Sequence, residues 1–345
     1  RYPGSPDLES FWKNLCDGVD AVGQVPAERW SMHRRLDTDV EQAVASGKCY
    51  TDSGAFLEGA TDFDPLFFNL APADAYNLNP QERLFIESCW HTVEDAGYTR
   101  ERLARQHQSR VGVFAGITKT GYELYGPALW SRGELAYPHT SFASVANRVS
   151  FLLNLQGPSL PVDTMCSASV TAIHEACESS RRGECELALA GGVNLYLHPS
   201  NYVMLCAQRM LSPTGRCRSF ASDGDGFVPG EGVGTALLKP LSAAERDGDP
   251  VRALIVGSAI NHGGRTNGYT VPNPTAQAAL VRTALDRAGV PAQAVSYIEA
   301  HGTGTRLGDP IEIAGLQAAF ESDDVGTASC AIGSLKSNIG HLEAA

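Results

Sequence analysis

The sequence predicts an α/β fold built from two similar halves, because the same order of elements occurs twice along the chain. A segment with helical spacing of apolar residues at 81–97 is followed by a short apolar strand, and the segment 276–289 repeats this plan. Both segments end in Ala-Gly. We therefore expect a first half at residues 1–245 and a second half at residues 246–345.

Two further strands support the repeat. The extended, proline-containing stretch 159–164 leads into Cys166, and the apolar stretch 331–336 leads into His341. In two similar halves, the carboxyl ends of equivalent strands come together, and α/β folds bind their ligands at such ends. We therefore expect Cys166 and His341 to meet between the halves.

Each expected helix and strand rests on a local pattern. The helix 81–97 has near-helical spacing of apolar residues and a glycine at its end. A third helix is expected from about 167 to 182, after Cys166. The strands that follow the two repeated helices are the short apolar runs 111–116 and 295–299. The apolar residues that define the first helix are Leu84, Ile86, Trp90, Val93 and Ala96.

Two stretches lack such patterns. The segment 219–234 is rich in glycine but has no G-x-G-x-x-G spacing, and an apolar strand at 235–238 follows it instead of a helix. We therefore expect a tight backbone turn near the core and no dinucleotide site. The stretch 29–47 is polar with little periodicity, which predicts a surface excursion.

Charge and cysteine content exclude several classes of protein. The 345 residues carry a net charge of −12 without a Lys/Arg cluster, which argues against nucleic acid or an anionic membrane as a partner. The nine cysteines form no C-x-x-C pair and no H-E-x-x-H occurs, so we expect neither a metal site nor a disulfide framework. No apolar run reaches the roughly 18–20 residues that span a bilayer. A reducing cytoplasm fits best.

Cys166 is the first candidate for catalysis, since it stands where an extended stretch ends and a helix is expected to begin. The unpaired N–H groups and the macrodipole of a helix N-terminus stabilise an anion by about 0.3–1 kcal/mol, or ~2 kcal/mol when partly buried. We therefore expect the pKa of this thiol to be lowered by about one unit. The other eight cysteines are expected to be small buried apolar residues.

Two histidines and a lysine in the second half complete the candidate set. His301 follows the strand 295–299 and precedes Gly-Thr-Gly-Thr, and His341 ends the run Lys336-Ser-Asn-Ile-Gly-His. One histidine past a strand end is more often a hydrogen-bonded structural residue. Two of them, in the same scheme of halves as Cys166, favour catalysis. We expect Lys336 to be partly buried and paired.

Three blocks resemble the active-site blocks of β-ketoacyl synthase domains from modular type I polyketide synthases. They are Asp163-Thr-Met-Cys-Ser-Ala-Ser, Glu299-Ala-His-Gly-Thr-Gly-Thr and Lys336-Ser-Asn-Ile-Gly-His-Leu-Glu-Ala-Ala. The resemblance covers essentially the whole chain, beginning at Arg1-Tyr-Pro-Gly. The sequence around Cys166 is similar to that of the subtype served by a separate acyltransferase, the trans-acyltransferase type.

This resemblance implies a thiolase-like fold with a duplicated α-β-α-β-α layered architecture, truncated here at both ends. It implies that Cys166 accepts an acyl or polyketide chain as a thioester. His301 and His341 would assist decarboxylation of a malonyl-type extender and stabilise the enolate, which attacks the acyl-Cys166 thioester in a Claisen condensation. Lys336 would tune and orient the histidine region.

The resemblance also implies partners. Substrates would arrive on the phosphopantetheine arm of an acyl carrier protein, with Thr303 and Thr305 as candidates for binding that arm. We expect no cofactor bound by the domain itself, neighbouring polyketide synthase domains, and a homodimer.

Rival functions remain beside this one. A non-elongating synthase, which only transfers the acyl chain, typically lacks the histidine that matches His301. A degradative thiolase would carry a second catalytic cysteine and lacks the Asn-Ile-Gly-His block. A carrier-protein docking scaffold would not need the Cys/His/His set, and a serine hydrolase would show G-x-S-x-G. Ala168 and Val170 depart from the Ser and Leu usual in the family, which predicts a changed pocket with activity retained.

Overall fold

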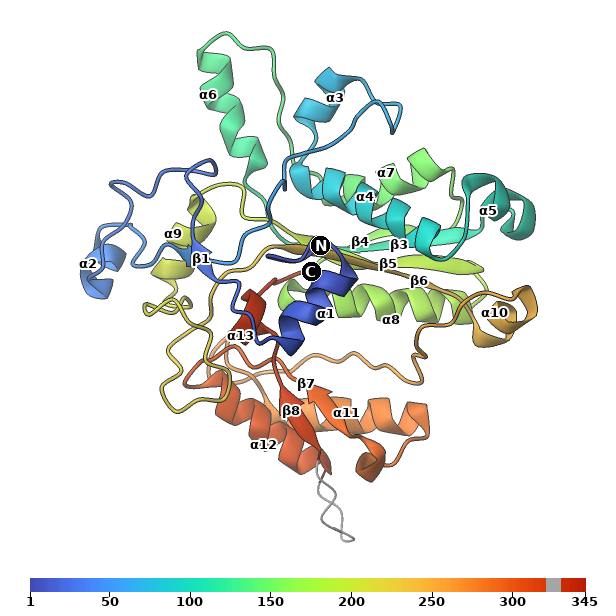
Figure 1. Cartoon of the computed structure of the whole chain (residues 1–345). Coiled ribbons are helices and arrows are strands. Elements are labelled where there is room, and N and C mark those ends of the chain that lie inside the picture. The colour runs from blue at the N-terminus through green and yellow to red at the C-terminus, as the bar shows by residue number, and fades with distance from the viewer. Residues whose placement is uncertain (321–329) are drawn as a thin grey trace.

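A computed structural model of the chain describes residues 1–320 and 330–345 (Figure 1). Its largest sheet has the strand order β4-β3-β5-β6, in which β4, β3 and β5 are parallel and β6 is antiparallel to β5. These strands are β3 (Val111–Gly116), β4 (Ser159–Val162), β5 (Leu187–Asn194) and β6 (Gly232–Leu238). Every residue of β3 and β5 is buried, since helices cover both faces of the sheet.

The helices on the two faces of the sheet differ in the size of the side chains through which they pack. On one face, α4 (Pro80–Asp95) and α7 (Phe142–Leu153) bury large residues such as Phe85 against the sheet (Figure 1). On the other face, α8 (Ala168–Arg181) packs small residues, among them Ala172 and Ala176, beside Phe114. The small residues allow α8 to approach the strands closely.

The second half continues the layering. Its strands β7 (Tyr297–Glu299) and β8 (Ala331–Gly333) pair in parallel, and α11 (Pro274–Ala288) packs against α12 (Gly308–Phe320). Figure 1 shows these elements on the side of α8 that faces away from the large sheet. The layered α/β architecture expected from two similar halves is therefore confirmed.

Shorter elements connect these layers. The remaining helices and strands are α1 (Leu8–Cys16), β1 (Gly23–Gln24), α2 (Val40–Ala45), β2 (Ser53–Gly54), α3 (Pro72–Asn77), α5 (Arg100–His107), α6 (Gly126–Ser131), α9 (Ser200–Ala207), α10 (Leu241–Asp247) and α13 (Lys336–Ile339). In the described part of the chain, 3₁₀ turns occur at Tyr122–Tyr125, Met165–Ser167 and Ala292–Ala294. Within the two described ranges, no helix is long and apolar enough to cross a membrane.

The local patterns located the main elements well. The expected helix 81–97 is α4, the expected helix 276–289 is α11, and the strand 111–116 has the bounds of β3. The strand expected at 331–336 is shorter in the structure, because β8 ends at Gly333 and Lys336 already begins α13.

Two expectations were wrong in part. Within 29–47, the side chains of Trp30 and Ala43 are buried, and the indole of Trp30 packs edge-on against Tyr202 with ring centroids 5.8 Å apart. Of the eight other cysteines, five are buried as expected, but Cys16 is exposed and two are half-buried. The half-buried ones are Cys177 and Cys330.

Candidate active site

Cys166 lies in the 3₁₀ turn that joins β4 to α8, so the expected position at the start of a helix is correct. The preceding Met165 adopts φ +57°, and its N–H is held by the carboxylate of Asp163 at 3.1 Å. Gly116 at the end of β3 allows the approach of α8, because a Cβ there would lie 2.6 Å from the backbone nitrogen of Ser169. The turn leaves Cys166 accessible to solvent as a residue, although the protein atoms crowded around its thiol remove part of the hydration of the sulfur.

The charge state of Cys166 differs from the sequence-based expectation. Its pKa is raised from 9.0 to about 11, first by loss of hydration and second by the carboxylate of Glu343. The ammonium groups of Lys119 and Lys336 oppose this shift without overcoming it. The expected lowering by the helix N-terminus was therefore wrong, because a macrodipole effect of about one unit is smaller than the combined cost of desolvation and a nearby negative charge.

His341 is buried and fixed on both sides of its backbone. Its N–H donates to the carbonyl of Val228 at 2.7 Å, and its carbonyl accepts from Gly230 at 2.9 Å. Its ring packs edge-on against Phe227 and against His301, with centroids 5.1 and 5.4 Å away. The structure therefore brings the two predicted histidines into contact.

The hydrogen bonds of His341 define its tautomer. The backbone N–H of Glu343 donates to Nδ1 at 3.1 Å, so Nδ1 is the acceptor and Nε2 carries the proton. Within residues 1–320 and 330–345, the buried Nε2 has no hydrogen-bond partner. The pKa of His341 is well below its usual value, because of burial and of the charges of His301, Lys336 and Lys119, so the ring is neutral near pH 7. The site thus contains a buried N–H donor without a partner.

His301 stands at the end of β7 on a loop that one carboxylate holds. Glu312 on α12 accepts the N–H of His301 at 2.6 Å and the N–H of Gly302 at 2.8 Å. The pKa of His301 is lowered, first by desolvation and then by the charge of Lys336. Its imidazole is therefore also neutral near pH 7.

The glycine-rich segment 219–234 connects both histidines. The N–H of Gly226 donates to the carbonyl of Gly304 at 3.0 Å, in the loop after His301, while Val228 and Gly230 hold His341. A Cβ at Gly224 would lie 2.7 Å from the carbonyl oxygen of Gly304, so only glycine permits this approach. The tight turn expected for this segment is confirmed, and it forms the support of the histidines.

The segment that follows His341 packs beside the helix that begins after Cys166. A Cβ at Gly192 would lie 2.2 Å from the carbonyl oxygen of Ala344 and 2.9 Å from Cβ of Ser169 on α8. Lys336 is half-buried as expected, at the first residue of α13. It has no ion pair within the described ranges, so the expected pairing is absent there. Its charge nonetheless affects the pKa of the predicted nucleophile and of both histidines.

The two candidate threonines lie on the loop between His301 and α12. Thr303 is buried and its hydroxyl lies 3.5 Å from that of Thr305. The hydroxyl of Thr305 accepts the N–H of Gly308 at 3.1 Å, and its own N–H donates to Asp309 at 3.3 Å. These contacts order the loop, and binding of a phosphopantetheine arm stays a prediction.

Four charged residues of the site carried no role in the sequence analysis. Asp309 accepts the N–H of Phe220 at 2.7 Å and so joins the His301 loop to the glycine-rich segment. Glu312 holds the His301 loop, and Lys119 forms a buried ion pair with Glu343 at 2.6 Å. An acidic residue in the first turn of a helix is a signal for Asp309, whereas Glu312 lies beyond the first turn and nothing local connects Lys119 with Glu343.

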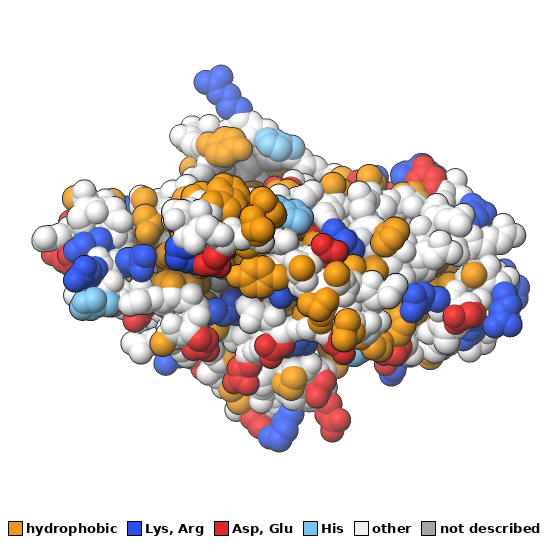
Figure 2. All heavy atoms as spheres, turned by 90° about the horizontal axis from the view of Figure 1, so that it is seen from above, with side chains coloured by type: hydrophobic (Ala, Val, Ile, Leu, Met, Phe, Trp, Pro, Cys, Tyr) orange, Lys and Arg blue, Asp and Glu red, His pale blue; other side chains and the backbone are white. Residues whose placement is uncertain are grey.

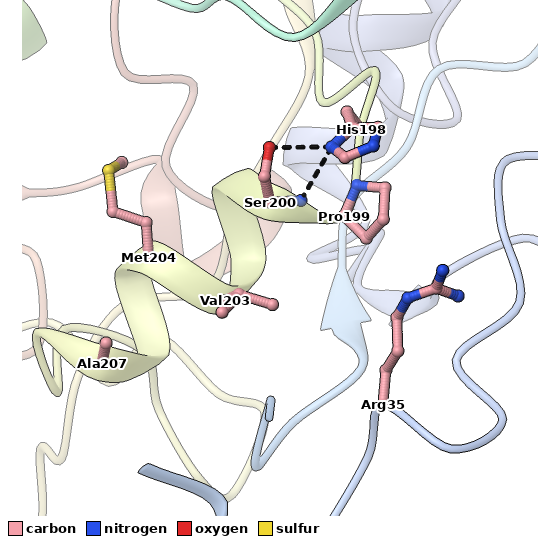
Figure 3. Close-up of a pocket in the computed structure, with 7 residues that line it drawn as sticks. All are labelled: Arg35, His198, Pro199, Ser200, Val203, Met204 and Ala207. Carbon is pink, nitrogen blue, oxygen red and sulfur yellow. Dashed lines mark hydrogen bonds between the residues drawn. The ribbon is translucent and has the colours of Figure 1, made fainter. Parts of the chain in front are cut away.

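A shallow basin elsewhere on the surface contains none of the predicted residues. It lies along α9, with Arg35 opposite Pro199 and His198 hydrogen-bonded to Ser200 (Figure 3). Val203, Met204 and Ala207 form its apolar floor. No group of three or more His, Cys, Asp or Glu that could hold a metal ion occurs in the described ranges.

Comparison with known families gives two matches that follow each other along the chain. Residues 1–244 match the model of the β-ketoacyl synthase N-terminal domain, and residues 252–345 match that of the C-terminal domain. Together with the layered fold, they define the class of the chain, a β-ketoacyl synthase domain with a thiolase-like fold. The chain belongs to the β-ketoacyl synthase family and is a ketosynthase of the polyketide synthase type.

Relatives and solved structures agree with this assignment. Polyketide synthase ThaG of Burkholderia thailandensis is 55% identical over 346 residues, which cover 100% of this chain and 6% of ThaG. Polyketide synthase PksL of Bacillus subtilis is 50% identical, with 100% and 8% covered. The chain thus spans less than a tenth of these two relatives.

Two solved ketosynthases have the same fold. The oxazolomycin ketosynthase domain OzmH KS7 of Streptomyces albus has a TM-score of 0.96 and 49% identity, with 100% of this chain and 60% of that chain covered. The ketosynthase from module 6 of the bacillaene synthase of Bacillus subtilis has a TM-score of 0.89 and 39% identity, with 100% and 57% covered. The family resemblance carried by the three sequence blocks is therefore confirmed.

Proposed function

We propose that this chain catalyses the decarboxylative Claisen condensation of a carrier-bound malonyl-type extender with an acyl or polyketide chain held on Cys166. The observation that carries the proposal is the buried, unpartnered Nε2–H of His341, in contact with the ring of His301. A buried donor without a partner is costly, and an enolate oxygen would satisfy it. We also propose that the chain divides into a half that carries the nucleophile, 1–245, and a half that carries both histidines, 246–345.

In the first step, Cys166 takes the acyl chain from a carrier thioester. The sulfur of Cys166 attacks the carbonyl carbon, the carbon–sulfur bond to the carrier breaks, and the proton of Cys166 passes to the departing carrier thiolate. Because the pKa of Cys166 is raised to about 11, the resting group is a thiol, and the proton leaves as the attack proceeds. A thioester intermediate divides the reaction into two feasible steps.

In the second step, the extender loses carbon dioxide. Its bond to the carboxylate breaks, and the electron pair forms an enolate whose oxygen accepts hydrogen bonds from His301 and His341. One such preorganised donor typically contributes about 3–4 kcal/mol to the transition state. The enolate carbon then attacks the acyl thioester, the new carbon–carbon bond forms, and the thiolate of Cys166 leaves and takes up a proton from solvent water. The lowered pKa values of the histidines favour this role, since each ring is neutral near pH 7 and can donate an N–H hydrogen bond to the enolate without first releasing a proton.

The partners follow from this reaction. We propose that substrates arrive on the phosphopantetheine of an acyl carrier protein, with Thr303 and Thr305 near the arm, and that neighbouring polyketide synthase domains supply and remove them. Similarity to ThaG, PksL and the two solved ketosynthases supports the trans-acyltransferase type.

We also propose a homodimer. Strand β4 is the edge strand of the large sheet, and Leu160 at its centre is 48% exposed, so its free edge can pair with a second copy. Figure 2 shows hydrophobic side chains gathered on the face that carries α3 and α6, where Trp130 and Leu135 are exposed. Sedimentation of the purified protein as a monomer would contradict this proposal.

The test of the reaction uses intact-protein mass spectrometry of the protein that contains residues 1–345. An acyl thioester should give an adduct on Cys166 that disappears when malonyl-loaded carrier protein is added, as a β-keto product appears on the carrier. His301→Ala should retain the adduct and lose the product, and Cys166→Ala should lose both. An adduct that persists in the unsubstituted protein would instead favour the non-elongating alternative. Loss of acylation in His301→Ala would contradict the role of His301.

A further inference from the structure

Next to the candidate nucleophile lies a charged pair that the proposed reaction does not use. Lys119 follows β3, Glu343 follows His341, and both side chains are only 4% exposed. The Lys119 ammonium lies 2.6 Å from one carboxylate oxygen of Glu343, and the hydroxyl of Tyr196 donates to the other. The ammonium also lies 5.7 Å from the centre of the Tyr196 ring.

Stability alone is a weak reason for such a pair. Apolar residues of similar volume often replace a buried ion pair without loss of stability. Glu343 in addition adopts φ +48°, a conformation that favours glycine. A side chain at a strained backbone position, in contact with a buried charge, points to a role at the site.

The pair lies between the nucleophile and the histidines. The backbone N–H of Glu343 holds Nδ1 of His341 at 3.1 Å. On the other side, the hydroxyl of Thr118, next to Lys119, donates to the sulfur of Met165 at 3.2 Å, directly before Cys166. A continuous set of contacts therefore runs from the turn of Cys166 through Lys119 and Glu343 to His341.

We propose that Lys119 and Glu343 are positioning residues, which balance the charge next to the thiol of Cys166, while the backbone N–H of Glu343 holds the ring of His341 in its donor tautomer. The inference rests on the proposed function of Cys166 and His341 as nucleophile and donor. Neither residue of the pair touches the reacting atoms in the proposed steps.

The charges around the thiol determine the expected signs. Four groups from separate parts of the chain act on or lie beside Cys166: Glu343, Lys119, Lys336 and the hydroxyl of Tyr196. The carboxylate disfavours the thiolate and the two ammonium groups favour it. Removal of the negative charge alone should therefore ease ionisation, and removal of the Lys119 charge alone should hinder it.

The experiment measures alkylation of Cys166 by iodoacetamide against pH, with peptide mass spectrometry to assign the cysteine. Glu343→Gln keeps the backbone N–H to His341 and removes the negative charge together with one of the two acceptor oxygens, so the midpoint should fall by about one unit. Alkylation at pH 8 should then be about three- to tenfold faster, since a thiolate of lower pKa is more abundant but less nucleophilic. Lys119→Met should shift the midpoint to higher pH.

Two further variants separate this effect from instability. The double variant Lys119→Met/Glu343→Gln lacks both charges of this pair and should return the midpoint close to that of the unsubstituted protein, even if Lys119→Met alone does not fold. Asp249→Asn, which weakens another buried ion pair with Lys239 at the far end of β6, should leave the midpoint unchanged. Equal midpoints for Glu343→Gln and the unsubstituted protein would overturn the proposal. Because alkylation needs no acyl substrate, this result is independent of whether the chain condenses or only transfers.

Discussion

Substitution of Glu312 by Gln tests whether one carboxylate holds the His301 loop in its active conformation. Glu312 accepts two backbone N–H groups, one on each oxygen, from His301 at 2.6 Å and Gly302 at 2.8 Å. A hydrogen bond to a charged group contributes about 1.5–3 kcal/mol. Glutamine keeps one acceptor oxygen and turns an NH₂ group toward the other N–H, so one hydrogen bond is lost. The active loop conformation should become about 10- to 150-fold less favoured, and since Glu312 is half-buried and water can replace the lost contact, we expect the lower end.

The assay separates acylation from condensation in single turnovers. In Glu312→Gln, the rate of condensation from preloaded acyl-Cys166 should fall about tenfold or more, while acylation should change by less than about twofold. Asp95→Asn is the matched control, because this carboxylate is exposed and its ion pair, with Arg252 at 3.3 Å, lies on the surface. Equal losses in both steps, or no loss in condensation, would refute the reasoning.

Two other predictions concern pH and packing. The pKa values of His301 and His341 are lowered, so both rings stay neutral as the pH falls through 6.5. The single-turnover condensation rate should therefore decline only below that pH. A decline centred at pH 6.5 or higher would contradict this prediction. Gly192→Ala places a Cβ 2.2 Å from the carbonyl oxygen of Ala344, and such overpacking costs about 1–3 kcal/mol. The urea midpoint of unfolding should therefore fall. An unchanged midpoint would show that the backbone around Ala344 can move aside without loss of stability.

The parts of the site that sequence could predict are those that depend on local pattern. Cys166 and His301 each lie within a few residues of the end of a strand, and a strand is recognisable from its short apolar run. The helix α4 is defined by its own apolar spacing and its terminal glycine. These signals need no knowledge of what lies across the fold, so their placement was correct.

The environment of Cys166 could not be predicted in the same way. The helix N-terminus is a local feature and favours an anion, whereas desolvation and the carboxylate of Glu343 depend on segments far apart in the sequence. The contact of Lys119 with Glu343 has no local signal for the same reason. Likewise, the polar stretch 29–47 gave no sign that Trp30 would be covered by Tyr202.

In the proposed reaction, the glycine-rich segment 219–234 would allow two histidines from separate blocks to act on one oxygen. His341 is hydrogen-bonded to Val228 and Gly230, and the loop of His301 is bonded to Gly226, so both rings are fixed to one short piece of backbone. A displacement of this segment would therefore move both donors together and preserve the distance between them. An enolate oxygen needs two donors at a constant separation more than it needs either donor to be rigid relative to the distant core. The glycines are required because backbone approaches of this closeness leave no room for a Cβ.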